Sequence, residues 1–417
     1  MRSQLARIVT KTVNSTSRRL GRGAGTVAGG RAGLAVDPQL LEHLSARRQV
    51  ALVSGTNGKT TTTRLLAVAL GADGADVVSN ETGSNMPPGL VAALAADRGA
   101  GRAVLEVDEI YVPRVLAATG ASTVVLLNLS RDQLDRTNEV RMVAGRWRAA
   151  LAAAPHTTVV ANADDPLVVW GAGAATSVRW VGAGMRWRHD AVGCPSCDGR
   201  IAFAADGSWA CSSGCGLARP ELTAWLEVDE GGIHRGVWAD GRTLEISLRL
   251  PGRFNHANAL MAAVAAECHD VSAEGALAAM APVAEVAGRF TTRDIGGVPA
   301  RLMLAKNPAG WSELLDLVGR GEGPLVVSIN ARTADGTDPS WLWDVPFESL
   351  CGRTVVASGD RCRDLSVRLQ YGGVAHSVEP DPVRAVTAAA SAGSAVETVV
   401  DVIGNYTAFG DLLGARS

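Results

Sequence analysis

Short apolar runs alternate with longer segments of helical periodicity along most of the chain. From residue 49 onward, runs rich in β-branched residues and bounded by turn residues predict strands, and the segments between them predict helices. The first half contains the predicted strands Val50–Val53, Ala103–Val107, Thr123–Leu127 and Thr158–Ala161, and the predicted helices Thr61–Leu70 and Leu90–Ala96. Because strands that alternate with helices form parallel sheets covered by those helices, this half predicts an α/β domain.

A second alternation of the same kind begins near residue 297. It contains the predicted strands Leu325–Ile329, Thr354–Ala357 and Thr398–Ile403, and the predicted helices Trp311–Val318 and Pro382–Ala390. A cysteine-rich stretch at about residues 190–220 interrupts the first alternation. We therefore expect an N-terminal segment over 1–47, a large α/β domain over 48–290 with a small insert, and a smaller α/β domain over 291–417.

The composition excludes several classes of protein. The chain has 417 residues, of which 47% are apolar, and a formal net charge of −2. This apolar content is too high for a disordered chain. The near-neutral charge lacks the basic excess of a general nucleic-acid binder, so we expect no nucleic-acid partner. No run approaches the ~18 apolar residues of a membrane span, and the N-terminus lacks the apolar core of a signal peptide. A soluble cytoplasmic protein is expected.

The first 36 residues are basic. They include seven arginine or lysine residues, and the first acidic residue is Asp37. One interpretation is a solvated, partly helical leader with a flexible glycine-rich hinge from Gly21 to Gly33. Another is an electrostatic contact with an anionic membrane surface, which would place the protein peripherally at the inner membrane face. A leader rich in arginine and poor in acidic residues is also typical of a transit peptide.

A phosphate-binding loop follows the first predicted strand of the α/β domain. The residues in question are Gly55, Thr56, Asn57, Gly58, Lys59, Thr60 and Thr61. Glycines let the backbone curl around phosphate oxygens, and the amides at the start of the following helix point at the anion. Lys59 would supply a cation to the outer phosphates, and Thr60 a hydroxyl to Mg²⁺. The common pattern has a glycine where this chain has Val53, so the loop is a variant that predicts binding of ATP and Mg²⁺.

This variant loop resembles the ATP loop of the Mur ligase superfamily, the enzymes that build peptidoglycan stem peptides and folate polyglutamates. Further motifs follow in the order of that family: Asn162-Ala-Asp-Asp-Pro166, Phe254-Asn-His-Ala-Asn258 and Gly288-Arg289. The resemblance implies that Asn258 contacts the base region of the nucleotide and Arg289 its phosphates. It also implies that Glu106 holds Mg²⁺ together with Thr60, and oxygen ligands of this kind suit Mg²⁺. The alternative for Glu106 is a carboxylate at the rim of the site.

Within the superfamily, the chain is most similar to the subunits that amidate D-glutamate in lipid II. The motifs that carry this resemblance are the segment 128–136, the cysteine insert, Ala305-Lys-Asn-Pro-Ala-Gly310, the segment 334–341 and Asn405-Tyr-Thr407. Such a subunit forms a heterodimer with a GatD-type glutamine amidotransferase, whose glutaminase releases ammonia. The implied reaction activates the α-carboxylate of D-glutamate as an acyl phosphate, and ammonia then gives D-isoglutamine.

Two other functions stay open at this point. One is a Mur-type or folylpolyglutamate-type ligase that adds an amino acid. Such ligases usually carry a carbamylated lysine, whereas this chain has no lysine between Lys59 and Lys306. The other is a nucleotide-dependent scaffold protein that carries a zinc ribbon.

The same resemblance implies roles for two residues of the C-terminal domain. Lys306 would bring a basic group to the γ-phosphate of ATP. Asp338 would orient the catalytic histidine of the glutaminase partner, because a carboxylate fixes the tautomer of an imidazole and stabilises its charged form. Asp335 is the nearest competitor for this role, and Asp338 can also be interpreted as a turn or cap residue.

The clustered cysteines predict a metal site. Cys194-Pro-Ser-Cys197 is followed, after thirteen residues, by Cys211-Ser-Ser-Gly-Cys215. Two such pairs give tetrahedral thiolate coordination, and Zn²⁺ in a closed structural site is the expected occupant. An iron–sulfur cluster or reduced thiols are the alternatives. The wider spacing of the second pair makes Cys215 the least regular of the four ligands.

Overall fold

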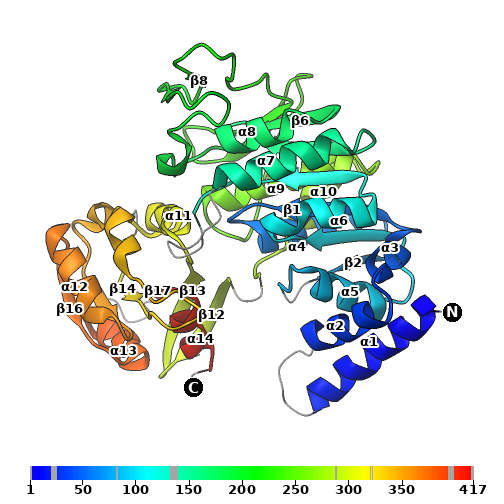
Figure 1. The fold of residues 1–417 in the computed structure, drawn as a ribbon. Coiled ribbons are helices and arrows are strands. Elements are labelled where there is room, and N and C mark those ends of the chain that lie inside the picture. Colours follow the sequence, from blue (N-terminus) through cyan, green and yellow to red (C-terminus); the bar gives the residue numbers. More distant parts are fainter. Residues whose placement is uncertain are drawn as a thin grey trace. The chain divides into compact units, whose positions relative to one another are not determined.

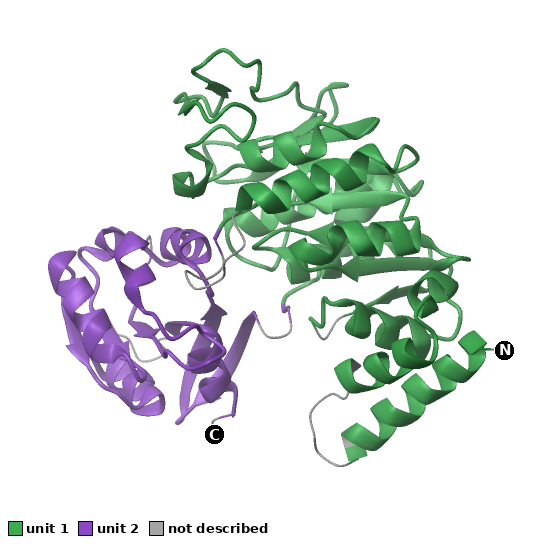
Figure 2. Ribbon diagram, in the orientation of Figure 1, with its two compact units in different colours: residues 1–130, 138–284 green, residues 131–137, 285–417 purple. Residues whose placement is uncertain are grey.

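The computed structural model describes residues 2–19, 26–80, 83–131, 140–286, 289–319, 321, 323–392 and 399–414. The chain forms two compact units, shown in different colours in Figure 2. The first comprises residues 1–130 and 138–284, and the second residues 131–137 and 285–417. The limits expected for the N-terminal segment and the two domains stay predictions. None of the described helices is long and apolar enough to cross a bilayer.

A nine-stranded sheet in the order β11-β10-β9-β6-β5-β4-β1-β3-β2 forms the centre of the first unit (Figure 1). Its strands from β1 to β6 are all parallel, and β6 pairs parallel with β9. The strands are β1 (Gln49–Ser54), β2 (Val77–Ser79), β3 (Arg102–Glu106), β4 (Thr123–Leu126), β5 (Thr158–Asn162), β6 (Ser177–Gly182), β9 (Ala224–Val228), β10 (His234–Trp238) and β11 (Thr243–Glu245). Because helices cover both faces, the central strands are continuous apolar runs, as is typical of parallel sheets.

Helices lie on both faces of this sheet (Figure 1). On one face α4 (Lys59–Leu70), α9 (Arg253–Glu267) and α10 (Ala273–Met280) pack against one another. The other face is covered by α6 (Val112–Thr119), α7 (Val140–Ala152) and α8 (Pro166–Ala172). The predicted α/β fold with a parallel sheet is confirmed.

The N-terminal segment is folded onto the first unit. It forms α1 (Arg2–Arg19), α2 (Thr26–Val36) and α3 (Leu40–Ser45), and α2 packs on α5 (Pro87–Ala96). A Cβ atom on Gly33 would lie 2.1 Å from Thr10 Oγ1, and one on Gly30 would lie 1.8 Å from the Pro88 carbonyl oxygen. Residues 26–33 were expected to be part of a flexible hinge, but they are helical. Their glycines allow α2 to pack closely against the neighbouring helices.

A six-stranded sheet in the order β12-β13-β17-β14-β15-β16 forms the second unit. Its strands are β12 (Phe290–Ile295), β13 (Val298–Leu304), β14 (Leu325–Ser328), β15 (Val355–Ser358), β16 (His376–Val378) and β17 (Val400–Gly404), and only the β12–β13 pair is antiparallel. Its helices are α11 (Pro308–Gly319), α12 (Cys362–Tyr371), α13 (Pro382–Ala392) and α14 (Tyr406–Gly414). The smaller α/β domain expected here is confirmed.

The strand order of the second unit gathers several loops at one edge of its sheet. The chain returns from α13 to place β17 between β13 and β14. Because the paired strands are parallel, the loops after β13, β14, β15 and β17 leave from the same edge. In open α/β sheets this edge is where ligands and functional side chains usually lie, at the point where the strand order reverses.

Candidate nucleotide, metal and partner sites

The phosphate-binding loop lies at the carboxyl end of β1, between the ends of β3 and β4. Gly55 and Gly58 have φ angles of 141° and 85°, in the region that favours glycine. A Cβ atom on Gly58 would also lie 2.9 Å from Asn258 Oδ1. Asn258, in the second turn of α9, thus lies directly against the loop, and its contact with the base region of a nucleotide stays a prediction. The N-terminus of α4 begins at Lys59 and presents its amides to this loop.

The segment that follows β4 holds the loop in shape. The Thr56 backbone N–H donates to the Asn128 carbonyl oxygen at 2.9 Å, and the Asn57 N–H donates to Asn128 Oδ1 at 2.9 Å. The Ser130 N–H donates to Thr56 Oγ1 at 2.9 Å. The motif beginning at Asn128 therefore supports the loop; residues 132–136 of that motif lie outside the described part of the chain.

The Asn162–Pro166 motif supports the same scaffold from the next strand. Asp165 is fully buried and caps α8 by accepting from the Leu167 and Val168 N–H groups. Its Oδ2 accepts from the Leu129 N–H at 2.8 Å. Burial raises the pKa of Asp165 to about 6, against the hydrogen bonds from these amides. Asp165 therefore connects β5 to the segment that carries Asn128.

Lys59 is buried within the loop. Its Nζ donates to the Gly55 carbonyl oxygen at 2.6 Å and forms an ion pair with Glu109 Oε1 at 2.9 Å. Burial raises the pKa of Glu109, while the positive charge of Lys59 acts in the opposite direction. Sequence reasoning missed Glu109, because it lies fifty positions away and only the β1–β3 pairing brings it to the loop.

Glu106 ends β3 beside the loop, where it pairs in register with Val53. Its side chain is 1% exposed, and Oε1 accepts from Asn85 Nδ2 at 3.3 Å. Its Oε2 has no hydrogen-bond partner among the described residues. An unsatisfied buried carboxylate oxygen is costly, and a divalent cation would satisfy it. Glu106 and Thr60, in the first turn of α4, fit the oxygen ligands that Mg²⁺ requires.

Two further residues expected to contact the nucleotide, Thr61 and Arg289, belong to different units of the chain. Thr61 follows Thr60 in the first turn of α4, within the first unit. Arg289 belongs to the second unit, just before β12, and its carbonyl oxygen accepts from the Leu304 N–H at 3.0 Å. Gly288, quoted with it in the sequence motif, lies outside the described residues.

The four clustered cysteines converge on one point. Their Sγ atoms all lie within 4.8 Å of one another, and the Cys194–Cys215 and Cys197–Cys211 pairs are 3.6 and 3.5 Å apart. A tetrahedral ion with metal–sulfur bonds of about 2.3 Å requires sulfurs about 3.8 Å apart. The Ser213 backbone N–H, with the neighbouring thiols, lowers the pKa of the Cys211 thiol. The set therefore fits a tetrahedral metal ion.

The cysteine cluster belongs to a small insert within the first unit. The insert contains a hairpin of β7 (Ile201–Phe203) and β8 (Trp209–Cys211). Cys211, at the end of β8, is the first cysteine of the second pair. Trp209 is 3% exposed and its Nε1 donates to the Ala163 carbonyl oxygen at 3.0 Å. Arg219 also pairs with Asp164, and Asp198 with Arg141. These few apolar side chains and polar contacts are too little for an independent core, so an ion would stabilise the insert.

Lys306 lies directly after β13 in the second unit. Its Nζ lies 5.0 Å from the centroid of the Tyr406 ring, which is a cation–π distance. The next residue, Asn307, is buried and its Oδ1 accepts from the Gly310 N–H at the start of α11. The backbone that carries Lys306 is thus fixed at the carboxyl edge of the sheet.

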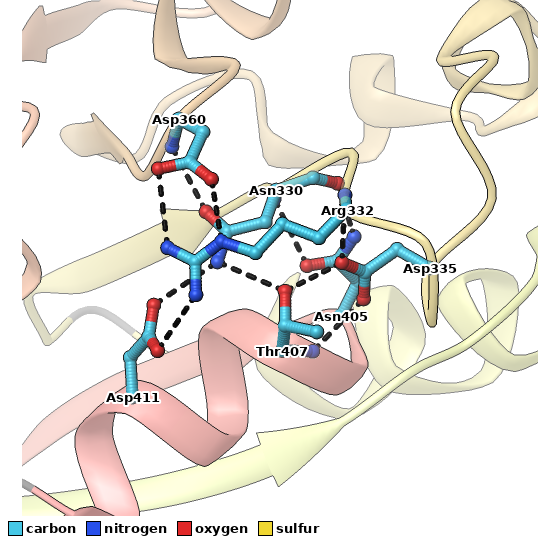
Figure 3. Close-up of polar contacts among 7 residues, drawn as sticks. All are labelled: Asn330, Arg332, Asp335, Asp360, Asn405, Thr407 and Asp411. Carbon is cyan, nitrogen blue, oxygen red and sulfur yellow. Dashed lines mark hydrogen bonds and ion pairs between the residues drawn. The ribbon is translucent and has the colours of Figure 1, made fainter.

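A polar network fixes the loop after β14 at the same edge (Figure 3). Arg332 forms ion pairs with Asp360 at 2.7 Å and with Asp411 at 2.9 Å. Asn330 and Asn405 exchange two hydrogen bonds, from the Asn330 N–H at 3.0 Å and from Asn405 Nδ2 at 2.6 Å. The network ties the start of the loop, from Asn330 to Asp335, to the segments that follow β15 and β17 and to α14.

Asp335 and Asp338 occupy different environments in this loop. Asp335 is buried, and its carboxylate accepts from the backbone N–H and the hydroxyl of Thr407. Asp338 is exposed and accepts from the Ser340 N–H at 2.8 Å, at the start of the short helix Ser340–Asp344. Because Asp335 is fully engaged within the chain, Asp338 is the better placed of the two to meet another protein.

Comparisons with known proteins agree with this architecture. Residues 53–190 match the Mur ligase middle domain, and residues 304–409 match the MurT ligase C-terminal domain. Similar solved structures include a pseudomurein peptide ligase type C from Methanothermus fervidus, with a TM-score of 0.68 and 19% identity over 90% of this chain and 80% of that one. MurF from Thermotoga maritima in complex with ADP has a TM-score of 0.62 and 15% identity over 90% of this chain and 81% of that one.

The variant phosphate loop and the two matched segments are similar to those of the Mur ligase superfamily of ATP-dependent ligases, and the fold is similar to that of solved peptide ligases. Within it, the chain is similar from end to end to the MurT subunit of the glutamine-hydrolysing lipid II isoglutaminyl synthase. The subunit from Streptococcus pneumoniae is 27% identical over 100% of this chain and 98% of its own length. The subunit from Staphylococcus aureus is 28% identical over 90% of this chain and 89% of its own length.

Proposed function

We propose that this protein is the synthetase subunit that amidates the α-carboxylate of D-glutamate in lipid II to D-isoglutamine. The observation that carries the proposal is similarity to MurT subunits over the whole chain, combined with a phosphate loop flanked by an unsatisfied buried carboxylate at Glu106. The partner would be a GatD-type glutamine amidotransferase that hydrolyses glutamine. Lipid II is held in the membrane by its lipid, so the reaction would take place at the inner membrane face.

The proposed reaction has two steps. A carboxylate oxygen of D-glutamate attacks the γ-phosphorus of ATP, and ADP leaves, which gives an acyl phosphate. Ammonia then attacks the acyl carbon, phosphate leaves, and ammonia loses a proton to form the amide. Activation is needed because a free carboxylate is a poor acyl donor.

The residues of the first unit would bind and orient ATP. Lys59 and the amides at the start of α4 would neutralise charge on the phosphates, and Asn258 would contact the base region. Glu106 and Thr60 would hold Mg²⁺, which shields the charge of the transferring phosphoryl group. From the second unit, Arg289 and Lys306 would contribute cations to the phosphates.

The rival function is addition of an amino acid to a muramyl or folate acceptor. Against it stands the absence of any lysine between Lys59 and Lys306, where such ligases usually carry a carbamylated lysine. A scaffold function with a zinc ribbon does not explain a complete phosphate loop with its supporting carboxylates.

The test measures ATP hydrolysis with each reactant in turn. The proposed function requires turnover that depends on lipid II, the glutaminase partner and glutamine together, with one amide formed for each ATP. Turnover with a free amino acid in place of glutamine and partner would instead establish an amino-acid-adding ligase. No turnover under any of these conditions would favour the scaffold function.

We propose zinc as the ion of the cysteine site, and the purified protein is expected to contain about one zinc per chain. Cys194→Ser should lose the ion and lower the melting temperature, because the buried thiolate is a ligand and metal binding drives folding of such inserts. Metal analysis and thermal unfolding measure both effects. Cys268→Ser, outside the cluster, is the matched control and should keep its zinc. Iron, or no metal, in protein prepared without oxygen would contradict the assignment.

Lys306→Ala is expected to reduce the rate of amidation by a larger factor than it reduces affinity for ATP. The reason is that a cation aimed at the transferring phosphoryl group acts mainly in the transition state. Steady-state kinetics and binding of a non-hydrolysable ATP analogue separate the two effects. Equal losses of affinity and of rate would contradict this role.

A further inference from the structure

The first helix has an outer face with two exposed apolar side chains and basic residues around them. Leu5 and Ile8 are 56% and 61% exposed, and they lie three positions apart on one side of α1. Lys11 and Arg19 are exposed on the same helix. The opposite side of α1, with Ala6 and Thr10, is buried.

The inner contacts of α1 fix which side faces outward. Thr10 and Asn14 lie so close to Gly33 and Gly29 of α2 that a Cβ atom on either glycine would overlap them. Arg7 donates through Nε to the Ala95 carbonyl oxygen at 3.1 Å, at the end of α5. Figure 1 shows α1 on the outside of α2 and α5. The exposed side is therefore a stable surface of the folded unit.

The charge of this surface indicates its partner. The first acidic residue of the chain is Asp37, so no carboxylate of α1 or α2 opposes the basic side chains. A basic helix with a few protruding apolar residues is typical of proteins that bind the surface of an anionic bilayer.

We propose that the outer face of α1 binds an anionic lipid bilayer, with Leu5 and Ile8 entering the headgroup region and Lys11 and Arg19 contacting lipid phosphates. This inference extends the proposed function, since it would hold the enzyme beside a lipid-linked substrate. Binding of this surface to the bilayer would not depend on ATP or on the sugars of lipid II. Its test can therefore succeed or fail independently of the amidation reaction.

The experiment is co-sedimentation of the full chain with vesicles of phosphatidylglycerol and phosphatidylcholine in equal parts, and with phosphatidylcholine alone. The expected result is binding to the anionic vesicles only, weakened as salt is raised. Lys11→Glu should weaken binding several-fold, since each basic residue near such a surface contributes about fivefold. The double variant Leu5→Asn, Ile8→Asn should weaken it at least about tenfold.

Matched controls change the same chemistry at exposed positions elsewhere in the first unit. Val228→Asn and Arg114→Glu should bind vesicles like the unaltered protein. Melting temperatures show whether each variant is folded. If the apolar double variant is unstable, the vesicle binding of Lys11→Glu alone tests the proposal. Equal binding to neutral vesicles, or binding unaffected by the α1 variants, would overturn the proposal. Loss of binding in the complex with the glutaminase would also overturn it, because α1 would then be covered by the partner.

Discussion

Replacing Lys59 with alanine is expected to reduce ATP turnover and amidation by a large factor while the first unit stays folded. The Lys59 ammonium lies inside the phosphate loop, hydrogen-bonded to the carbonyl oxygens of Gly55 and Thr56. It is the cation that would offset charge on the transferring phosphoryl group, and removing such a group typically costs on the order of 10²–10³ in kcat. Lys59→Ala also leaves the buried Glu109 carboxylate without its ion-pair partner, so the melting temperature should fall, although Asn128 still holds the loop.

The ion pair of Lys59 supplies the control for this experiment. Glu109→Gln leaves the lysine in place and removes only its carboxylate partner, so most of the turnover should remain. Lys59→Arg keeps the positive charge but changes its shape. It should restore little of the ATP turnover, since a guanidinium does not replace a compact ammonium. Near-normal amidation by Lys59→Ala would rule out the phosphate-loop assignment.

Asp338→Asn is expected to reduce glutamine-dependent amidation by about 10⁴-fold, as for a triad aspartate changed to asparagine. If Asp338 orients the catalytic histidine of the partner, asparagine removes the charge that supports the imidazolium and favours the wrong tautomer. ATP binding should be unchanged, because the phosphate loop belongs to the other unit. Ammonium at high concentration should restore amidation, since it bypasses glutamine hydrolysis.

Two outcomes of this experiment would reject the role of Asp338. If the residue only caps the helix Ser340–Asp344, asparagine caps nearly as well and activity with glutamine should stay high. Loss with both glutamine and ammonium would indicate a defect in the synthetase itself. Asp344→Asn changes another exposed aspartate of the same short helix and is the matched control.

Asp335 has a different expected signature. Because its carboxylate is buried and bonded to Thr407, Asp335→Asn should lower the melting temperature of the second unit. A merely catalytic carboxylate at this position would leave the melting temperature unchanged.

The sequence predicted the parallel strands well because they are buried on both faces and appear as continuous apolar runs. Val50–Val53, Ala103–Val107 and Thr123–Leu127 correspond to β1, β3 and β4 within a residue or two. The outer strands β9, β10 and β11 were missed. Their burial is mixed, so their sequences lack a clear apolar run. The glycines of α2 suggested a hinge, whereas contacts distant in sequence decide that they pack in a helix.

Linear motifs located the phosphate loop and the cysteines, because each set is contiguous or closely spaced. The residues that support them were found only in the structure. Glu109 reaches Lys59 through the pairing of β1 with β3, and Asp165 supports Leu129 from the neighbouring strand. These side chains are ordinary in the sequence, and only the topology makes them partners. Likewise, Asp335 is buried and Asp338 exposed because Thr407, which is distant in the sequence, bonds to Asp335.

The parallel pairing of β6 with β9 means that the cysteine insert also connects two neighbouring strands of the sheet. These two strands are parallel neighbours, so the chain between them must travel back along the sheet before β9 can begin. The insert is that return path, and shortening it to a tight turn would leave the outermost three strands without a connection. One of them carries His234, whose ring stacks on His256 of α9 at 3.8 Å. If the cysteines bind an ion and Asn258 contacts the nucleotide, as proposed, losing the ion would loosen the support of the helix that carries Asn258. Chelation should then weaken nucleotide binding without removing any residue proposed to contact the nucleotide.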